Sequence, residues 1–312
     1  MPQLAIDLGG TAVKLGVADR ASILVEDSFP AADGGVALEH AERAAERMLR
    51  GERPDAVAIA VPGIVDPDRR RLVAAHDKYD RLRGVDLADW SLRTFGATAV
   101  VENDARAALI GEMSGGSATG ARDAVLIALG TGIGTAAAVD DQVLRGAHGH
   151  AGVLSGHVTV DLDGPSCPCG NLGCAEALAS TWALRASIEQ GAVAIGPELA
   201  ARFATMPALG IRDLVETVHE PESAAILERY VRIWGAVVVA QCHAFDPTVV
   251  VVTGGVMRSG TLVLPALVEY VHGHLWSSAH RPAFVTPERP EQSVLRGLAR
   301  LALDTRNERG NA

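Results

Sequence analysis

Residues 4–18 read Leu-Ala-Ile-Asp-Leu-Gly-Gly-Thr-Ala-Val-Lys-Leu-Gly-Val-Ala, and this stretch decides the fold. Two apolar segments, Leu4–Leu8 and Val13–Ala18, flank a pair of glycines, which predicts two paired strands joined by a tight turn. A phosphate-binding turn needs close backbone approach, a hydroxyl group and a metal-facing carboxylate. The turn supplies candidates for each: Gly9, Gly10, Thr11 and Asp7. A single stretch of this kind is equally typical of an ordinary glycine hairpin.

Two further glycine loops repeat the design. The segment 130–135, Gly-Thr-Gly-Ile-Gly-Thr, lies between the apolar segments 124–129 and 134–139, and Thr253-Gly254-Gly255 follows the apolar segment 248–252. A nucleotide settles at such carboxyl ends of strands. No lysine follows a glycine, which excludes a Walker A loop, and the first of these two loops precedes a strand, which excludes the Rossmann fingerprint. Together the loops favour nucleotide binding by Gly130, Thr131, Gly132, Gly254 and Gly255.

Strands and helices alternate in both halves of the chain, which predicts an α/β fold. Apolar periodicity predicts helices over residues 37–49, 104–113, 174–190, 197–205, 222–245, 261–275 and 292–304. A Gly/Ser segment at 114–120 follows a finished helix and forms a natural boundary. We therefore expect an N-terminal domain over residues 1–117 and a C-terminal domain over 118–291. We expect a helix at about 292–308 to pack back on the first domain.

The composition is that of a globular protein with a large core, because 48% of the 312 residues are hydrophobic. The net charge of -10 is spread along the chain, which argues against nucleic acid as a partner. Apolar runs stay far below the roughly 18 residues of a membrane span, and no basic-then-apolar leader precedes Ile6. We expect a cytoplasmic protein that binds neither nucleic acid nor a membrane.

A metal-binding pattern stands in the loop that follows residue 146. One imidazole and three thiols, His157, Cys167, Cys169 and Cys174, are enough to close a tetrahedral zinc site with no position left for water. A closed zinc site is structural, and it would order a long Gly/Pro-rich loop that has no core of its own. Cys242 stands alone in an apolar helical segment and is interpreted as a core residue.

Glu102-Asn103-Asp104 follows a predicted strand and opens a predicted helix. Asn or Asp at this place commonly caps the helix and does nothing else. The same position also brings a carboxylate to the carboxyl end of a strand, where it can act as a general base. The segment alone leaves both interpretations open.

With these motifs in this order, the chain resembles the ROK family, within the actin-like ATPase superfamily. The resemblance covers nearly all of the chain and rests on Asp7–Thr11, Glu102–Asp104, Leu129–Thr135, His157–Cys174 and Thr253–Gly255. It implies two ribonuclease-H-like (actin-like) domains with an interdomain cleft that takes ATP and a sugar. It also implies a sugar kinase that works with Mg²⁺, holds a structural Zn²⁺ and forms a homodimer.

The resemblance also implies individual roles. Asp104 is the general base that accepts the proton of the attacking sugar hydroxyl, which in the family is the primary 6-hydroxyl. His157 binds both metal and sugar, and the other sugar-binding positions are Gly63, Asn103 and Glu176. Thr11 and Lys14 are the candidates for contacts with the phosphates of ATP.

Two segments depart from the family pattern. Residues 151–157 read Ala-Gly-Val-Leu-Ser-Gly-His, where ROK glucokinases usually carry A-G-E-x-G-H with a sugar-binding Glu. Residues 76–80 read His-Asp-Lys-Tyr-Asp, where the family often has an N-L-P-G-W-like loop. Because acidic groups at Asp77 or Asp80 suit an ammonium group or additional hydroxyls, we expect a hexose or amino-hexose substrate. Asp77 and Lys78 are the substrate-binding positions expected in this segment. An ordinary glucokinase with a drifted loop is the alternative.

Members of this family that act as repressors carry a DNA-binding segment before the first glycine loop, and here six residues precede Asp7. We therefore expect an enzyme. A catalytically silent sugar sensor is the remaining alternative.

Overall fold

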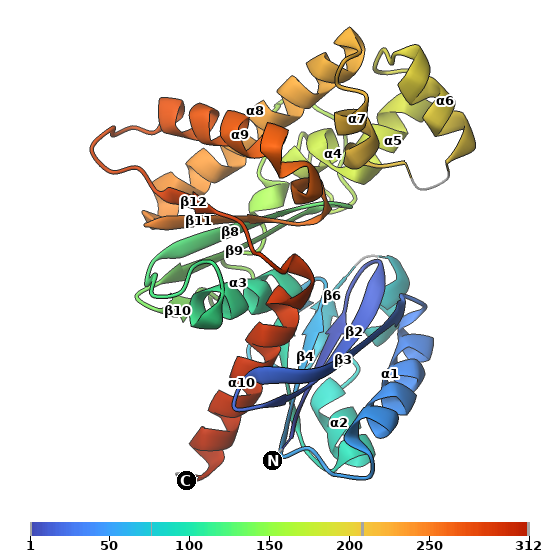
Figure 1. Ribbon diagram of the computed structural model, residues 1–312, viewed down its shortest axis with the longest axis vertical. Helices are drawn as coiled ribbons and strands as arrows, with labels where there is room; N and C mark the ends of the chain where they lie inside the picture. Colours follow the sequence, from blue (N-terminus) through green and yellow to red (C-terminus); the bar gives the residue numbers. More distant parts are fainter. Residues whose placement is uncertain (1, 76, 207–208, 311–312) are drawn as a thin grey trace. The chain divides into compact units, whose positions relative to one another are not determined.

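The computed structural model describes residues 2–75, 77–206 and 209–310, without the side chains of residues 77, 78, 258, 259 and 308–310. The chain folds into two compact units (Figure 1). Unit 1 consists of Met1–Ala121, Val143–Ala151 and Pro287–Ala312, and unit 2 consists of Arg122–Gln142 and Gly152–Thr286.

A mixed five-stranded sheet of order β3-β2-β1-β4-β7 forms the centre of unit 1. Its strands are β1 (Gln3–Leu8), β2 (Ala12–Asp19), β3 (Ser22–Pro30), β4 (Ala56–Val61) and β7 (Ala99–Asn103). β1 is antiparallel to β2 and parallel to β4, which is parallel to β7. Every residue of β1 and β4 is buried, because helices cover both faces of the sheet.

One face of this sheet is covered by α1 (Gly34–Leu49) and α2 (Leu87–Phe95), whose apolar residues share a core with Leu4, Ile6 and Leu8. Successive side chains of a strand point to opposite faces. Ala5 therefore joins the second core, which α3 (Asp104–Gly115) and α10 (Ser293–Gly310) complete on the other face.

The helices α3 and α10 approach each other closely at two glycines. A Cβ on Gly297 would overlap the carbonyl oxygen of Ala107, and a Cβ on Gly111 would overlap that of Ser293. Small residues at both positions let the two backbones touch, which fixes α10 on the sheet of unit 1. The helix expected at about residues 292–308 is thus present and contacts α3, β1 and β4.

The connection between β4 and α2 holds three short elements of unit 1. These are β5 (Ile64–Val65), β6 (Leu72–Ala74) and the 3-10 helix η1 (Asp77–Leu82). β5 and β6 pair antiparallel as a two-stranded sheet of their own. This connection carries Gly63, Arg69 and Tyr79.

Unit 2 repeats the same sheet plan, with the order β10-β9-β8-β11-β12. Its strands are β8 (Ala124–Leu129), β9 (Ile133–Val139), β10 (Gln142–Val143), β11 (Val249–Thr253) and β12 (Ala283–Val285). β8 is antiparallel to β9 and parallel to β11, which is parallel to β12. β8 and β9 therefore correspond to β1 and β2, and each pair is joined by a glycine turn.

Helices of unit 2 pack around the long helix α8 (Pro221–Phe245), which contacts α9 (Gly260–His274) and α4 (Ala175–Ala179). The indole nitrogen of the buried Trp234 donates to the carbonyl oxygen of Ala179 at 2.8 Å. The shorter elements are η2 (Ser155–His157), α5 (Thr181–Glu189), α6 (Pro197–Thr205), α7 (Ile211–Glu216) and η3 (Gly255–Ser259). The 3-10 helix η4 (Pro290–Gln292) precedes α10 in unit 1.

Several sequence expectations differ from the structure. The helix expected over residues 174–190 is two helices, because Ser180 is extended and its hydroxyl oxygen caps α5 by accepting the amide of Ala183 at 3.1 Å. The helices α2 and α7 and the short strands β5, β6, β10 and β12 were not predicted. Residues 143–151, placed by sequence in the second domain, belong to unit 1, where the side chain of Arg106 holds their carbonyl groups.

Among the described residues, no helix has the length and apolar character needed to cross a membrane.

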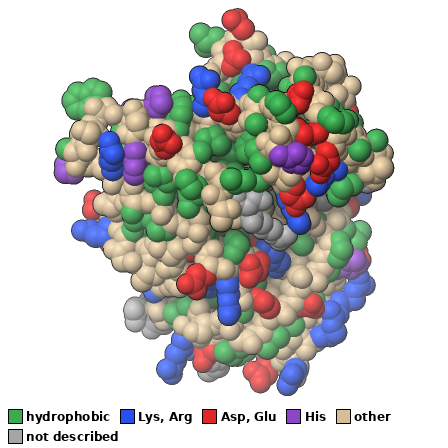
Figure 2. All heavy atoms as spheres, turned by 45° about the horizontal axis from the view of Figure 1, so that its top comes forward, with side chains coloured by type: hydrophobic (Ala, Val, Ile, Leu, Met, Phe, Trp, Pro, Cys, Tyr) green, Lys and Arg blue, Asp and Glu red, His purple; other side chains and the backbone are tan. Residues whose placement is uncertain are grey.

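Acidic and basic side chains are intermingled over the face shown in Figure 2. The α/β fold class, with two mixed five-stranded sheets, is confirmed.

Candidate active site

The carboxylate of Asp104 stands at the first position of α3, directly after β7. Asn103 caps this helix, because its Oδ1 accepts the amide of Arg106 at 3.1 Å. The amide nitrogen of the Asn103 side chain donates to the Gly63 carbonyl at 3.0 Å and to Asp104 Oδ1 at 3.1 Å. Asp104 Oδ1 also accepts the amide of Ala105 at 2.8 Å. The cap expected from the sequence is therefore present at Asn103, which also orients the carboxylate beside it.

One oxygen of Asp104 is held in place and the other is available. The hydrogen bonds from Asn103 and Ala105 both end on Oδ1, so Oδ2 can accept a proton from an incoming hydroxyl group. Burial raises the pKa of Asp104 to about 6, against hydrogen bonds from the amides of Ala105 and Asp104 and from the Asn103 side chain that lower it. A carboxyl with this pKa is ionised at neutral pH and is more basic than an ordinary aspartate.

Asp7 is a second carboxylate of the candidate site; it is buried, and it is the last residue of β1 that pairs with β4. Burial raises its pKa to about 7, while Lys14 lowers it and the charge of Asp104 raises it. The ammonium nitrogen of Lys14 lies 3.8 Å from Asp7 Oδ2 and donates to the carbonyl oxygen of Glu291 at 3.3 Å. Asp7 and Asp104 therefore act on each other electrostatically within one site, where a divalent cation would relieve the repulsion. Their oxygens are the kind of ligand that Mg²⁺ prefers.

Tyr79 fixes the first glycine loop. Its hydroxyl donates to the carbonyl oxygen of Gly9 at 2.9 Å, and its ring is buried. Burial, and then the charges of Asp7 and Asp104, raise the pKa of Tyr79, so the hydroxyl stays protonated and remains a donor. A Cβ on Gly9 would lie 2.7 Å from the carbonyl oxygen of Ala12, so this position requires glycine.

Other predicted positions of unit 1 differ in their surroundings. A Cβ on Gly10 would meet no atom within 4 Å, and both Gly10 and Thr11 are exposed. Gly63 has a φ of 124°, and a Cβ there would overlap the carbonyl oxygen of Ala74. Gly63 thus acts through its own carbonyl, which holds Asn103. The side chains of Asp77 and Lys78 lie outside the described residues.

In unit 2, two of the predicted glycine loops lie against each other. Gly254 has a φ of 98°, and a Cβ on it would overlap the backbone of Leu129, directly before Gly130. A Cβ on Gly130 would lie 4.0 Å from the amide nitrogen of Gly255. Thr131 is exposed at the tip of its loop, between β8 and β9. The sequence-distant loops 130–132 and 254–255 thus form one backbone surface at the carboxyl ends of β8 and β11.

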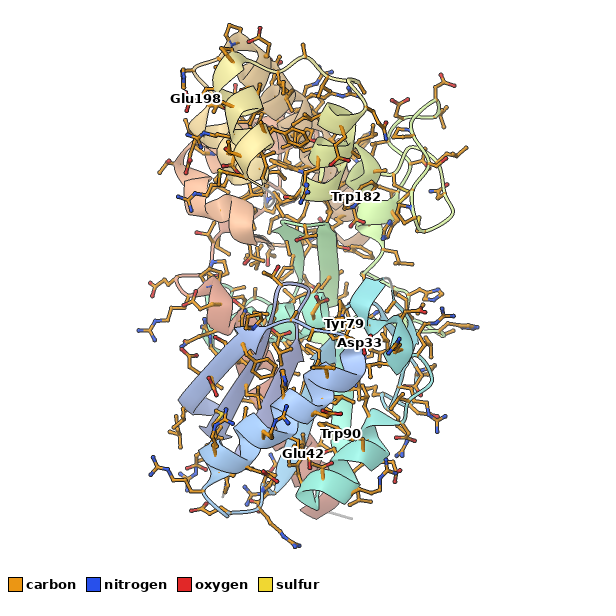
Figure 3. The ribbon with its side chains drawn as sticks, turned by 90° about the vertical axis from the view of Figure 1, so that its right-hand side faces the viewer. Asp33, Glu42, Tyr79, Trp90, Trp182 and Glu198 are labelled. Carbon is orange, nitrogen blue, oxygen red and sulfur yellow. The ribbon has the colours of Figure 1, made fainter. Side chains whose placement is uncertain are left out.

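Glu176 is bound to this surface. Its Oε2 accepts the amide of Ile133 at 2.8 Å, and its Oε1 accepts the indole nitrogen of Trp182 at 3.4 Å. A Cβ on Gly132 would overlap the same carboxylate. Both Glu176 oxygens are therefore used within unit 2, on the loop between β8 and β9. Trp182 (Figure 3) was missed by the sequence reasoning, as was Tyr79.

A candidate metal centre lies in unit 2. One ligand atom from each of four residues lies within 4.8 Å of the others: His157, Cys167, Cys169 and Cys174. The Cys167 sulfur is 3.6 Å from His157 Nδ1, and the Cys169 and Cys174 sulfurs are 3.7 Å apart. A tetrahedral zinc ion with Zn–S of about 2.3 Å and Zn–N of about 2.0 Å separates its ligands by roughly 3.5–3.8 Å. The donor set and its spacing therefore fit zinc.

The segment that departs from the family pattern leads into this centre. Val153 is buried and Leu154 is exposed. The Thr135 hydroxyl donates to the Gly152 carbonyl at 2.8 Å and accepts the amide of Ser155 at 3.1 Å. These bonds hold the segment against β9, and η2 then brings His157 to the three cysteines.

Two sheets of equal strand order, each with a glycine turn between its first two strands, define a two-unit α/β protein of the actin-like class. The family model "ROK family" matches residues 3–305, and the chain belongs to the ROK family. Glucokinase of Thermotoga maritima is 30% identical over 288 residues, which cover 89% of this chain and 90% of that protein.

Two further similar proteins belong to different functional classes, a kinase and a transcriptional repressor. The crystal structure of a ROK family glucokinase from Streptomyces griseus, in complex with glucose and AMPPNP, has a TM-score of 0.83 and 29% identity. The match covers 97% of this chain and 100% of that one. The xylose repressor of Bacillus subtilis is 25% identical over 223 residues, covering 71% of this chain and 53% of the repressor. Kinases and transcriptional regulators are thus both similar to this chain.

Proposed function

We propose that the protein is an ATP-dependent sugar kinase that phosphorylates a hexose or amino-hexose at its 6-hydroxyl. The observation that carries the proposal is the Asp104 carboxylate, whose Oδ1 is fixed by Asn103 and Ala105 while Oδ2 is available. A phosphoryl transfer enzyme mainly positions groups and supplies charge, and it needs one base oriented toward the attacking hydroxyl. The similar glucokinase that holds glucose and AMPPNP supports this assignment.

In this mechanism the sugar hydroxyl donates to Asp104 Oδ2 and loses its proton to that oxygen as the phosphoryl group is transferred. Asn103 and Gly63 hold the carboxylate in place, and Asn103 is also the candidate for contacts with other sugar hydroxyls. A bound Mg²⁺ would neutralise charge on the phosphate oxygens, and Asp7 is the residue that would hold it. In unit 1, Gly9, Gly10, Thr11 and Lys14 are the candidates for phosphate contacts.

The glycine surface of unit 2 takes a share in nucleotide binding in this proposal. The amides of residues 130–132 and 254–255 offer donors beside the ends of two strands. Glu176 supports the first of these loops through Ile133, so it acts on nucleotide binding as well as on the sugar contact that the family resemblance implies. The cluster of His157 and three cysteines would hold a structural Zn²⁺ that orders residues 157–174.

The substrate preference rests on the two departures from the family pattern. Val153 or Leu154 would take the place where ROK glucokinases usually have a sugar-binding Glu, and neither side chain offers an acceptor to a sugar hydroxyl. Each sugar hydroxyl left unpaired costs about 1–3 kcal/mol of binding. An amino group in place of a hydroxyl would instead be attracted by the acidic segment with Asp77. We extend the proposal to a homodimer, as the resemblance implies, and to a cytoplasmic location, as expected from the sequence composition.

A coupled ADP-release assay with MgATP tests the proposal. Glucose, glucosamine, 3-amino-3-deoxyglucose, mannose, N-acetylmannosamine and N-acetylglucosamine serve as acceptors. We expect turnover of one sugar, its loss in Asp104→Asn, and full activity in the exposed control Asp140→Asn. A higher kcat/KM for glucose than for every amino sugar would contradict the amino-hexose preference and would indicate an ordinary glucokinase. No turnover with any sugar, together with intact sugar binding, would favour the silent sensor. The similarity to a xylose repressor is the reason for considering that role.

A further inference from the structure

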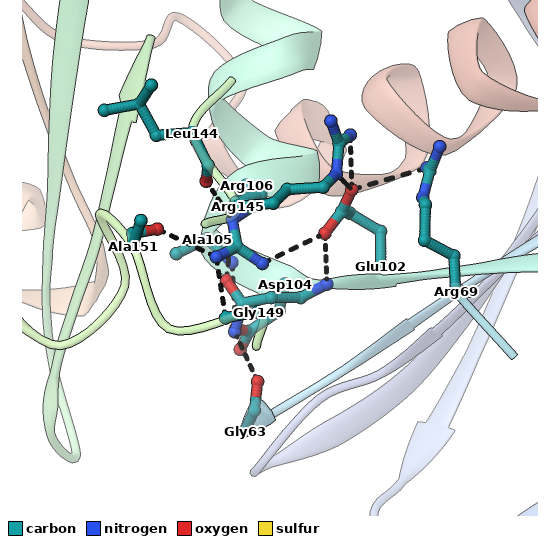
Figure 4. Close-up of polar contacts among 11 residues, drawn as sticks. Gly63, Arg69, Glu102, Asp104, Ala105, Arg106, Leu144, Arg145, Gly149 and Ala151 are labelled. Carbon is teal, nitrogen blue, oxygen red and sulfur yellow. Dashed lines mark hydrogen bonds and ion pairs between the residues drawn. The ribbon is translucent and has the colours of Figure 1, made fainter. Parts of the chain in front are cut away.

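Three guanidinium groups meet at one buried carboxylate in unit 1 (Figure 4). Glu102, next to Asn103 in β7, has only 1% of its side chain exposed. Arg145 makes a bidentate pair with Glu102 Oε2, through Nη2 at 2.7 Å and Nε at 3.0 Å. Arg69 Nη2 lies 3.3 Å from the same oxygen, and Arg106 Nη1 donates to Oε1 at 3.4 Å. Three positive charges therefore surround one negative charge.

The three arginines differ in their exposure and in the hydrogen-bond donors that remain for a ligand. Arg106 is buried, and it donates Nε to the Leu144 carbonyl and Nη2 to the carbonyls of Gly149 and Ala151, all at 2.7–2.8 Å. Arg145 has 30% of its side chain exposed, and its Nη1 has no bonded partner among the described residues. Arg69 has 25% exposed. The accessible positive charge of the cluster thus belongs to Arg69 and Arg145.

A cavity of about 260 Å³ opens over these side chains. Its other walls are Val65, Asp66, Pro67, Gly146 and Gly149. Asp66 is the second carboxylate of the lining, and its Oδ1 is occupied by the amides of Arg70 at 2.7 Å and Arg71 at 2.9 Å. The lining therefore carries three positive and two negative charges. Its volume lies just below the roughly 300 Å³ at which pockets for larger ligands begin, which suits a small anion.

We propose that this cavity binds a phosphate group, either inorganic phosphate or the phosphate of a monoester, between Arg69 and Arg145. A guanidinium group recognises a phosphate by paired N–H donors, and it does so best where water is partly excluded.

The cavity is connected to the candidate active site by two hydrogen bonds. Glu102 Oε1 accepts the amide of Asn103 at 3.0 Å, and the amide of Arg106 donates to Asn103 Oδ1 at 3.1 Å. A phosphate that shares Arg69 and Arg145 with Glu102 would thus act on the residue that orients Asp104. This connection rests on the proposed function, whereas phosphate binding itself does not.

Isothermal titration calorimetry of the full chain tests the binding without any turnover. The titrants are inorganic phosphate and glucose 6-phosphate, with MgAMPPNP present so that nucleotide phosphate positions are filled. We expect saturable binding of at least one titrant and a rise in Kd of at least about tenfold in Arg145→Gln and in Arg69→Gln. Arg81→Gln, an exposed arginine of the same unit, is the matched control and should leave Kd within about twofold.

The two titrants separate the sources of the phosphate. Tighter binding of glucose 6-phosphate indicates a monoester, and tighter binding of inorganic phosphate indicates the free ion. Absence of saturable binding overturns the proposal, as does a Kd that neither Arg145→Gln nor Arg69→Gln changes. Equal displacement by chloride at matched ionic strength overturns it too, because it indicates charge screening alone. Because the titration requires no catalysis, it detects phosphate binding even in a protein without kinase activity.

Discussion

The hydroxyl of Tyr79 and the carbonyl oxygen of Gly9 are joined by a 2.9 Å hydrogen bond between residues 70 positions apart in sequence. This bond attaches η1 to the turn between β1 and β2. It also places a protonated phenol near the carboxylates of Asp7 and Asp104, because burial and then these two charges raise the pKa of Tyr79. The glycine turn is therefore held by a side chain from the connection between β4 and α2.

Tyr79→Phe removes this bond and keeps the buried ring. We expect a loss of about 1 kcal/mol in the free energy of unfolding, because the Gly9 carbonyl loses its donor. We also expect a several-fold rise in KM for ATP, since the turn becomes less well held. Urea unfolding and initial rates measure the two effects. Tyr270→Phe is the control, because Tyr270 stacks on His274 through its ring. A Tyr79→Phe protein identical to the native one in both measurements would contradict the assigned role.

The pH profile of the proposed kinase should report Asp104. Because burial raises the pKa of this base to about 6, kcat/KM should fall about tenfold for each pH unit below that value. Rates measured between pH 5 and 8 at saturating Mg²⁺ test this. A flat profile over that range would exclude Asp104 as the base.

Asp7→Asn should stabilise the protein most at alkaline pH. Burial raises the folded-state pKa of Asp7 from 3.8 to about 7, so folding favours its protonated form. Its contribution to stability is intact below about pH 4 and is lost as the pH rises through 7. The gain in unfolding free energy from Asp7→Asn should therefore be about 2–3 kcal/mol larger at pH 8 than at pH 5.

Urea unfolding without Mg²⁺ at both pH values measures this gain. The exposed Asp140→Asn serves as control and should show the same small effect at pH 5 and pH 8. If the gain in unfolding free energy from Asp7→Asn is the same at both pH values, the pKa of the Asp7 carboxyl is not raised in the folded protein.

Cys169→Ser tests the metal centre with the most exposed of its three thiols. Loss of one thiolate should lower the zinc content measured by mass spectrometry and should lower Tm, because binding to a structural site contributes folding free energy. Cys242→Ser, a buried cysteine outside the cluster, should keep the zinc content of the native protein. Equal zinc content in both variants would show that the cluster is not the zinc site.

Gly297→Ala tests the contact between α10 and α3. The new methyl group would overlap the Ala107 carbonyl, so the helices must separate. We expect a loss of about 1–3 kcal/mol in unfolding free energy, typical of an overpacked core. Gly115→Ala has open space around its Cβ and should be neutral or slightly stabilising. A neutral Gly297→Ala would mean that α10 is free to shift.

The local parts of this site are readable from sequence, and the long-range parts are not. Asn103 next to Asp104, the glycine turns and the four clustered metal ligands each lie within a short segment. The pairs Tyr79–Gly9, Glu176–Ile133 and Arg145–Glu102 join segments 43 to 70 residues apart, which no local pattern marks. Strands such as β12, with three residues, carry too few positions for a periodicity to appear.

The same limit applies to the units. The Gly/Ser segment indicated a boundary near residue 117, close to the end of the first stretch of unit 1 at Ala121. The return of residues 143–151 to unit 1 depends on the side chain of Arg106, which binds three of their carbonyl groups. Such an attachment is a tertiary interaction, and the apolar pattern of the segment does not encode it.

The position of α10 bears on how the protein is made. This helix covers one face of the first sheet, yet the ribosome synthesises it after all of unit 2. Until then the apolar face formed by Ala5, Ala58 and Ala60 lacks the part of its cover that α10 supplies, although β1 and β4 have long left the exit tunnel. Unit 2 therefore has its complete sequence before unit 1 does, and the nascent chain exposes a surface that chaperones bind and that favours aggregation.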